Sequence, residues 1–216
     1  MSYTWDVFIS YKRDYQDEAA GPMLALRRQW LKETFLPVFS WALSAEIGRQ
    51  PKIFWDVRLQ TGDFFEEELV EALAGSKCMV AILSNPYLYD SEWCLREFCF
   101  MKKRYETSRE TYPNTYIYPI LYQKTDTGHP LIRGMQVSDY TRYNKFGKAF
   151  IESEAYLQFQ SDMNNTVPTI AKVIQHPPDW KEEWTSKTWL AEIEPMVKSY
   201  KLDMNAPKME SKNIQM

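Results

Sequence analysis

Short runs of consecutive apolar residues constrain the fold of this 216-residue chain more than any other feature. In residues 5–10 and 78–83 the apolar side chains follow one another directly instead of alternating with polar ones. Such runs are typical of parallel strands that helices cover on both faces. The fourth run contains Pro119, which weakens the prediction of a strand because proline donates no ladder hydrogen bond. We expect five strands, at residues 5–10, 53–55, 78–83, 116–122 and 137–142.

Stretches with helical periodicity lie between these runs. Residues 23–35 are expected to form a helix that breaks or kinks at Pro37, with a second piece reaching residue 47. Asp63 and Glu66 resemble a capping box that opens a helix, and Gly75 is suited to follow the end of that helix. Alternating strands and helices predict an α/β fold, with a mainly parallel sheet and helices on both faces. Further helices are expected at residues 92–106, 150–159 and 169–175.

A pair of prolines at residues 177–178 marks a boundary near the C-terminus. We therefore predict a domain over residues 1–176 and a helical extension over residues 177–216. Residues 201–216 are polar and are expected to be frayed. The extension carries three tryptophans in an amphipathic setting, typical of a terminal helix docked on the domain: Trp180, Trp184 and Trp189.

The segment after the third predicted strand contains the strongest candidate for a functional site. Residues 91–97 read Ser-Glu-Trp-Cys-Leu-Arg-Glu, and Asp90 or Ser91 is suited to cap the helix that follows. Residues four apart share a helix face, so Trp93 and Glu97 should point together. An aromatic plate beside a carboxylate can hold a flat, cationic or sugar-bearing ligand. The alternative is a surface glutamate that follows a core tryptophan.

Ligands in open α/β sheets bind outside the carboxyl ends of the strands, where the strand order reverses. If the order is 2-1-3-4-5, this point lies between the first and third strands. The loop after the third strand leads to Trp93 and Glu97. The two cations in the loop after the first strand, Lys12 and Arg13, would therefore face that carboxylate and that aromatic ring across one crevice. The loop after the first strand holds Ser10, Tyr11, Lys12 and Arg13.

Composition and motif content argue against several classes of function. The net charge of −3 is unfavourable for a nucleic-acid-binding surface, which requires a basic face. The two histidines, His129 and His176, have no metal-ligand spacing, so we expect neither a metal site nor a histidine-activated nucleophile. The sequence also lacks Walker-type and G-x-G-x-x-G phosphate loops.

Cysteine usage and hydropathy predict a cytoplasmic protein without a membrane partner. The longest apolar stretch, near residues 35–43, is too short to span a bilayer and contains Pro37. The N-terminal residues lack the charged and apolar regions of a secretory signal. An odd number of cysteines in core-like segments indicates a reducing compartment: Cys78, Cys94 and Cys99.

Three segments in order resemble those of the TIR (Toll/interleukin-1 receptor) domain family, and the resemblance covers residues 3–175. Residues 5–13, Trp-Asp-Val-Phe-Ile-Ser-Tyr-Lys-Arg, resemble its first box. Residues 56–62 resemble its BB loop, with a leucine and a glycine before a helix. Residues 91–98 are similar to the segment that carries the catalytic glutamate in enzymatic TIR domains of bacteria, plants and some animals. Tyr-Pro-Ile at residues 118–120 fits the family's fourth strand.

This resemblance, which is to the NAD⁺-cleaving branch and the stand-alone bacterial type, implies a flavodoxin-like fold and cleavage of the nicotinamide–ribose bond. Glu97 then corresponds to the catalytic carboxylate, and Trp93 lines the same pocket. NAD⁺ is the implied substrate, and no cofactor or metal is expected. The implied substrate contacts are Ser10, Tyr11, Lys12 and Arg13, with Arg58 and Ser84 added from position alone.

The resemblance also implies a product, partners and a biological role. The product would be ADP-ribose or a cyclic ADP-ribose-type signal, formed in immune defence, including anti-phage defence, or in regulated cell death. TIR–TIR self-association and a downstream effector that responds to the nucleotide are implied partners. Two alternatives stay open: a non-catalytic TIR scaffold, and an enzyme like the nucleoside 2-deoxyribosyltransferases. The chain departs from the family at residues 37–48, a candidate insertion, and after residue 177.

Overall fold

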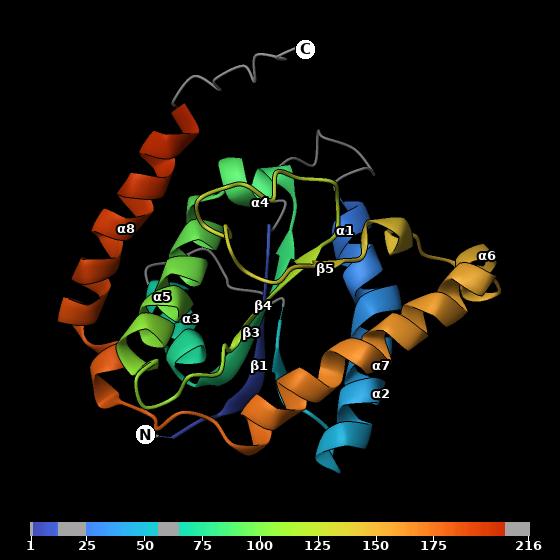
Figure 1. Ribbon diagram of the computed structural model, residues 1–216, viewed down its shortest axis with the longest axis horizontal. Coiled ribbons are helices and arrows are strands. Elements are labelled where there is room, and N and C mark those ends of the chain that lie inside the picture. Colours follow the sequence, from blue (N-terminus) through green and yellow to red (C-terminus); the bar gives the residue numbers. More distant parts are fainter. Residues whose placement is uncertain (1, 13–24, 56–64, 206–216) are drawn as a thin grey trace, which may run out of the picture.

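A parallel sheet of five strands forms the centre of the computed structural model, which describes residues 2–12, 25–55 and 65–205 (Figure 1). All neighbouring strands run parallel, in the order β2-β1-β3-β4-β5. The α/β class and this strand order confirm the sequence prediction, and they place the carboxyl ends of β1 and β3 side by side. The strands are β1 (Trp5–Tyr11), β2 (Ile53–Phe54), β3 (Ser76–Leu83), β4 (Ile117–Leu121) and β5 (Ser138–Asp139).

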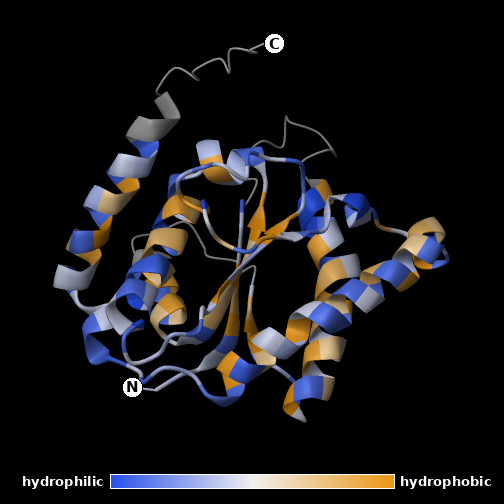
Figure 2. Cartoon of the chain, in the orientation of Figure 1, coloured by the Kyte–Doolittle hydropathy of each residue, from blue (hydrophilic) through white to orange (hydrophobic). Residues whose placement is uncertain are grey.

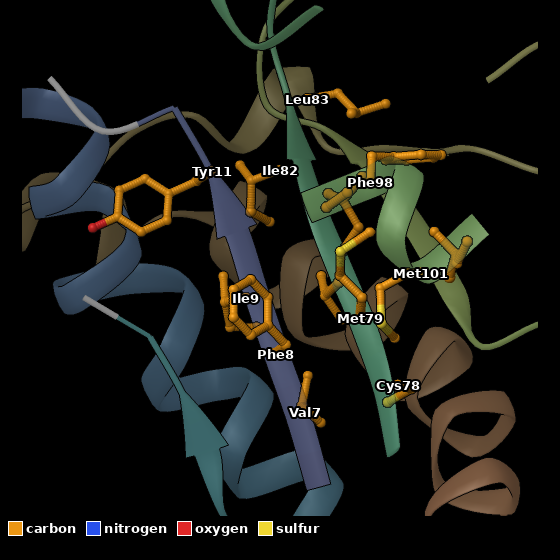
Figure 3. Packing of buried hydrophobic residues seen from close by; sticks show 14 of the residues in the cluster. Val7, Phe8, Ile9, Tyr11, Cys78, Met79, Ile82, Leu83, Phe98 and Met101 are labelled. Atoms are coloured by element: carbon orange, nitrogen blue, oxygen red, sulfur yellow. The ribbon is translucent and has the colours of Figure 1, made fainter. Parts of the chain in front are cut away.

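Strands β1 and β3 are buried on both faces. Residues 7–9 of β1 and 78–83 of β3 are all buried. Figure 3 shows side chains of both strands packed together with Phe98 and Met101. The apolar centre and the more polar outer sides of the helices are visible in Figure 2. Cover by helices on both sides explains why these two runs are continuously apolar.

Pro119 lies within β4 without interrupting it. The carbonyl of Leu121 accepts a hydrogen bond from the Tyr140 N–H, so the backbone groups of the odd-numbered residues of β4 point toward β5. Strand β5 pairs only with the last two residues of β4. The nitrogen of Pro119 therefore faces a position that precedes β5 in the chain, where a missing N–H breaks no ladder hydrogen bond.

The chain does not break at Pro37, because a π-helical turn precedes the proline. Pro37 has no N–H and cannot bond to the carbonyl four residues back. In the π-helical turn the Leu36 N–H donates to the Leu31 carbonyl, one residue further back than in an α-helix. The wider turn takes up the disturbance and the helix continues. Its three parts are α1 (Ala25–Trp30), η2 (Leu31–Phe35) and α2 (Leu36–Ile47).

A single helix, α7 (Glu154–Gln175), replaces the two helices predicted at residues 150–159 and 169–175. Pro168 lies inside α7 and costs about 3 kcal/mol relative to alanine. An apolar stripe outweighs this cost because it is buried where α7 packs against α2 (Figure 1). The stripe consists of Phe159, Met163, Val167, Ile170, Ala171 and Ile174. The short elements before α7 are η3 (Thr141–Tyr143) and α6 (Lys148–Ile151).

Helices α3 (Phe65–Ala74) and α5 (Glu92–Ser108) cover the opposite face of the sheet (Figure 1). Helix α3 ends before Gly75, as predicted, while the predicted loop and cap at residues 56–64 lie outside the described chain. A Cβ on Gly75 would lie 2.8 Å from the Glu71 carbonyl oxygen. Glycine is therefore required where the chain passes from α3 directly into β3.

A short helix, α4 (Asn85–Tyr89), lies where the sequence analysis expected a loop. Ser84 caps it, since its Oγ accepts a hydrogen bond from the Tyr87 N–H at 3.3 Å. Pro86 sits in the first turn, where its fixed φ suits a helix. Ser91 then caps α5 in the same way. Two successive caps turn the chain from β3 into α5.

The C-terminal segment lies along α5 as η4 (Glu182–Thr185) and α8 (Lys187–Asn205) (Figure 1). The prediction of a frayed end from residue 201 is wrong for its first part, because Lys201 is helical and its Nζ pairs with a Glu92 carboxylate oxygen. Residues 206–216 lie outside the described chain. None of the described helices combines the length and apolarity needed to span a membrane.

Two tryptophans anchor this segment. Trp184 is fully buried, and its ring lies 3.9 Å from the guanidinium carbon of Arg104. Arg104 is itself fully buried, and it donates hydrogen bonds to the Leu73 and Ser76 carbonyls. Trp180 Nε1 donates to the last carbonyl of α3 at 3.1 Å. The cation–π contact and these hydrogen bonds fix η4 against the body of the protein.

Asp6 is a buried carboxylate that joins three separate segments. Arg49 Nη1 and Nη2 donate to its two oxygens at 2.6 and 2.7 Å, and Lys77 Nζ donates to Oδ1 at 3.0 Å. The backbone N–H of Lys52 donates to Oδ2 at 2.9 Å. Burial alone would raise the pKa of Asp6, but these hydrogen bonds and the Lys77 charge lower the pKa to about 2.

Acid is therefore expected to weaken the fold through Asp6. The folded pKa lies below the model-peptide value of 3.8, so the stabilisation is full above about pH 4 and is lost as the pH falls to about 2. The loss should be about 1–2 kcal/mol, since the Arg49 side chain is half exposed and screened. Urea unfolding of wild type and Asp6→Asn at several pH values measures it. A difference between the two proteins that is equally large at pH 2 and pH 6 contradicts this prediction.

Candidate functional site

Glu97 lies in the second turn of α5 and faces the carboxyl end of β1. Only 5% of this residue is exposed. Burying a carboxylate is costly unless it is hydrogen-bonded. Ser10, the second-last residue of β1, meets this need because its Oγ donates to Glu97 Oε2 at 2.5 Å. The parallel sheet thus brings together two residues that the sequence analysis assigned to one site.

The hydroxyl of Tyr87 extends this contact into a chain of hydrogen bonds. Ser10 Oγ lies 2.7 Å from Tyr87 Oη, and both residues are fully buried. Because Ser10 gives its only hydroxyl hydrogen to the carboxylate, Tyr87 donates to Ser10. Burial raises the pKa of Tyr87 well above its usual value, as do the nearby Cys94 and Glu97, so the phenol keeps its proton. Tyr87 on α4 therefore fixes Ser10, and Ser10 fixes Glu97.

The other predicted residues around the ends of β1 and β3 are placed differently. Tyr11 is buried in the core, and Ser84 is fully buried with its hydroxyl capping α4. In this conformation neither side chain presents a surface to a ligand. Lys12 is half-buried, and its Nζ lies 3.4 Å from the Asp90 carbonyl, just before α5. Arg13 and Arg58 lie outside the described residues.

Trp93 lies one turn before Glu97 on α5, and 36% of it is exposed. The guanidinium carbon of Arg96 lies 5.2 Å from the centre of the Trp93 ring. Arg96 also forms ion pairs with Glu92 at 2.9 Å and with Glu194 of α8 at 3.1 Å. Trp93 is therefore a partly exposed aromatic plate with a cation held over it.

A cavity of about 620 Å³ lies between three helices, next to Trp93 and Glu97. Trp93, Arg96 and Glu97 come from α5, and the other walls are α3 and the segment from η4 to α8. The volume lies in the range of ordinary small-molecule sites. Apolar side chains such as Val70 and Leu190 form much of the surface. The cavity thus has the size and mixed lining of a ligand-binding site.

The charged groups of this cavity are mainly acidic. Arg96 and Lys187 supply its positive charges. A carboxylate held in such a partly desolvated place can stabilise positive charge that develops on a bound ligand. In the described ranges, no three His, Cys, Asp or Glu side chains gather closely enough to hold a metal ion. The acidic side chains are Glu67, Glu71, Glu97 and Glu194.

Two contributions to this site were missing from the sequence analysis. Tyr87 lies between the third predicted strand and residues 91–97, but no sequence pattern reveals that it bonds to Ser10, 77 residues earlier. The α8 wall follows from how the C-terminal helix docks, which periodicity does not specify. The tryptophans of the extension predicted that this helix docks, but not that its Glu194 reaches the Trp93 side of α5.

Comparison with known proteins identifies a family and similar solved structures. The family model of the TIR domain matches residues 7–153. Among solved structures, the chain is similar to the TIR domains of the activated Roq1 resistosome directly recognizing the pathogen effector XopQ. The identity is 17%, the alignment covers 91% of this chain and 99% of that chain, and the TM-score is 0.35. Comparison with curated proteins finds no significant match.

The matched segment spans well over half of the chain. It runs from the middle of β1 to the region before α7, and so contains Ser10, Tyr87, Trp93 and Glu97. Helix α8, which forms one wall of the cavity, lies outside it. On this match, and with a five-stranded parallel sheet in the order 2-1-3-4-5, the chain belongs to the TIR domain family.

Proposed function

We propose that this TIR domain protein hydrolyses NAD⁺ at the bond between nicotinamide and ribose. The observation that carries the proposal is the buried carboxylate of Glu97, held at 2.5 Å by Ser10 and lining a cavity beside Trp93. A carboxylate whose hydrogen-bond partner comes from another element has a fixed position, which electrostatic stabilisation of a transition state requires. A surface glutamate with only a solvating role would not need this arrangement.

The chemistry requires few groups from the protein. The bond between ribose C1′ and the pyridinium nitrogen breaks, and the electron pair leaves with nicotinamide, which becomes neutral. Because the leaving group carries a positive charge, it needs no general acid. The ribose becomes an oxocarbenium-like cation, as in glycoside cleavage. Glu97 stabilises this cation, and water adds to C1′ with release of one proton, giving ADP-ribose. Capture by the adenine of the same molecule would instead give a cyclic product.

The proposal includes further substrate contacts. Trp93 offers its exposed part to the flat nicotinamide or to the ribose. Lys12, at the end of β1, supplies a positive charge for the pyrophosphate. Arg13 and Arg58 are further proposed contacts, while Ser10 serves here to position Glu97. Self-association of TIR domains, an effector that responds to the product, and a role in immunity or cell death belong to the same proposal.

A TIR scaffold without catalysis is the second candidate. The observation that favours it is Trp41 on α2, a large apolar side chain that is 62% exposed. Exposed tryptophans are enriched in protein–protein contacts, since they bury a large area when a partner binds. A scaffold, however, does not need the Tyr87–Ser10–Glu97 chain.

Incubation of the protein with NAD⁺ separates these candidates. We expect nicotinamide and ADP-ribose, or a cyclic isomer, to appear by chromatography as NAD⁺ disappears. The assay should use both concentrated and dilute protein, because activity that depends on self-association falls on dilution. A parallel reaction with a deoxynucleoside and a free base tests the deoxyribosyltransferase alternative. Release of no nicotinamide at any concentration, even with a crowding agent, would contradict the proposal and favour the scaffold.

A further inference from the structure

Helix α8 is attached to α5 by charged contacts along its length. Lys201 pairs with Glu92, and Glu192 pairs with Lys103. Between these contacts, Glu194 Oε1 lies 3.1 Å from Arg96 Nε. Buried apolar residues of α8, among them Ile193 and Val197, pack beneath the charged contacts. The helix is therefore held in one register along α5 (Figure 1).

Among these contacts, the one made by Glu194 is directed into the cavity. Glu194 and Arg96 both line it, whereas Glu192 and Lys103 do not. Arg96 is held by Glu92 of its own helix and by Glu194 of α8, with Trp93 beneath its guanidinium. An arginine side chain otherwise samples many rotamers. Carboxylates from two helices and one aromatic ring hold Arg96 over Trp93.

We infer that α8 forms a functional wall of the substrate cavity. Glu194 is a positioning residue: it holds Arg96, and Arg96 in turn holds the Trp93 ring. The identity of the ligand rests on the proposed function, while the geometry does not. The inference assigns a role in the site to a helix that lies outside the matched segment of the family. It predicts that a change at Glu194 alters how substrate is held more than how fast bound substrate reacts.

Kinetics of Glu194→Gln test this role, with Glu192→Gln as the matched control. Each variant removes one ion pair between α8 and α5. Because Lys103 is more buried than Arg96, Glu192→Gln should weaken helix docking at least as much as Glu194→Gln does. We expect Glu194→Gln to raise the KM for NAD⁺ about fivefold with kcat nearly unchanged, the size expected for a partly exposed ion pair. Glu192→Gln should keep the wild-type KM. Equal KM values for the two variants would overturn the inference.

A second measurement tests the geometry without any reaction. Fluorine NMR of protein labelled with 5-fluorotryptophan resolves the tryptophan signals, and the Trp93→Phe variant identifies the Trp93 signal. Glu194→Gln should shift or broaden this signal, and Glu192→Gln should leave it in place. An unchanged Trp93 signal in Glu194→Gln overturns the positioning role whether or not the protein cleaves NAD⁺. Failure of wild type to cleave NAD⁺, combined with the expected shift, would instead refute the proposed function and keep the role of α8 in shaping the cavity.

Discussion

Replacement of Glu97 by glutamine is expected to lower nicotinamide release by about three orders of magnitude. Glutamine has nearly the same shape as glutamate and still accepts a hydrogen bond from Ser10, but it carries no negative charge to stabilise the oxocarbenium-like ribose. The thermal midpoint should change by no more than about 2 °C, since the packing around the side chain is kept. Initial rates by chromatography and a thermal melt of the same preparation measure both quantities.

Glu106→Gln is the matched control for this experiment. Glu106 lies on the same helix, is exposed, and pairs with Lys102 four residues earlier at 3.2 Å. Its replacement makes the same chemical change on α5 away from the cavity, so wild-type turnover is expected. Retention of turnover by Glu97→Gln would refute the assigned mechanism. Loss of turnover in both variants would mean that the effect comes from α5 as a whole and not from the Glu97 carboxylate.

Replacement of Trp184 by alanine is expected to lower the free energy of unfolding by about 3–5 kcal/mol. The indole is fully buried, forms an edge-to-face contact with Trp180 at 6.3 Å between ring centres, and covers the guanidinium of Arg104. The substitution leaves a large cavity and removes the cation–π partner of a buried charge. For a chain of this size the thermal midpoint should fall by roughly 6–20 °C. Urea unfolding and a thermal melt both measure the change.

Trp41→Ala provides the comparison on the surface. Trp41 loses the same atoms but is mostly exposed on α2, so its replacement should change the free energy of unfolding by no more than about 0.5 kcal/mol. A similar, small effect for Trp184→Ala would show that the C-terminal segment does not stabilise the body of the protein. The Trp184 contact with Arg104 would then have little energetic weight.

Most of the sheet could be predicted from the sequence because a strand that is buried on both faces has consecutive apolar residues. The runs that became β1 and β3 are continuously apolar, and this pattern fits few alternatives. The helices on the face of the sheet covered by α2 and α7 were harder to predict. Pro37 and Pro168 carry strong local signals for a break, yet in both places tertiary packing or a π-helical turn keeps the chain helical. Local propensity correctly marked both prolines as unfavourable inside a helix, but it wrongly predicted an interruption of the helix at these positions.

The candidate site was predictable in part for a similar reason. Trp93 and Glu97 lie one helical turn apart, so their spacing alone places them together. Ser10 could be placed near them from the topology of a parallel sheet, although its bond to Glu97 could not. Tyr87 and Glu194 reach the site through tertiary contacts across 77 and 98 residues, since they meet Ser10 and Arg96. No spacing rule in the sequence encodes contacts of that kind.

The position of α8 also affects when the cavity is completed during synthesis. A ribosome makes the chain from its N-terminus, so β1, α3 and α5 are produced well before residue 187. A nascent chain that stops before α8 already contains every strand of the sheet, together with Ser10 and Glu97, but it lacks the wall that holds Arg96 over Trp93. The complete cavity therefore belongs to chains that have been translated through α8, and newly forming chains do not yet contain it.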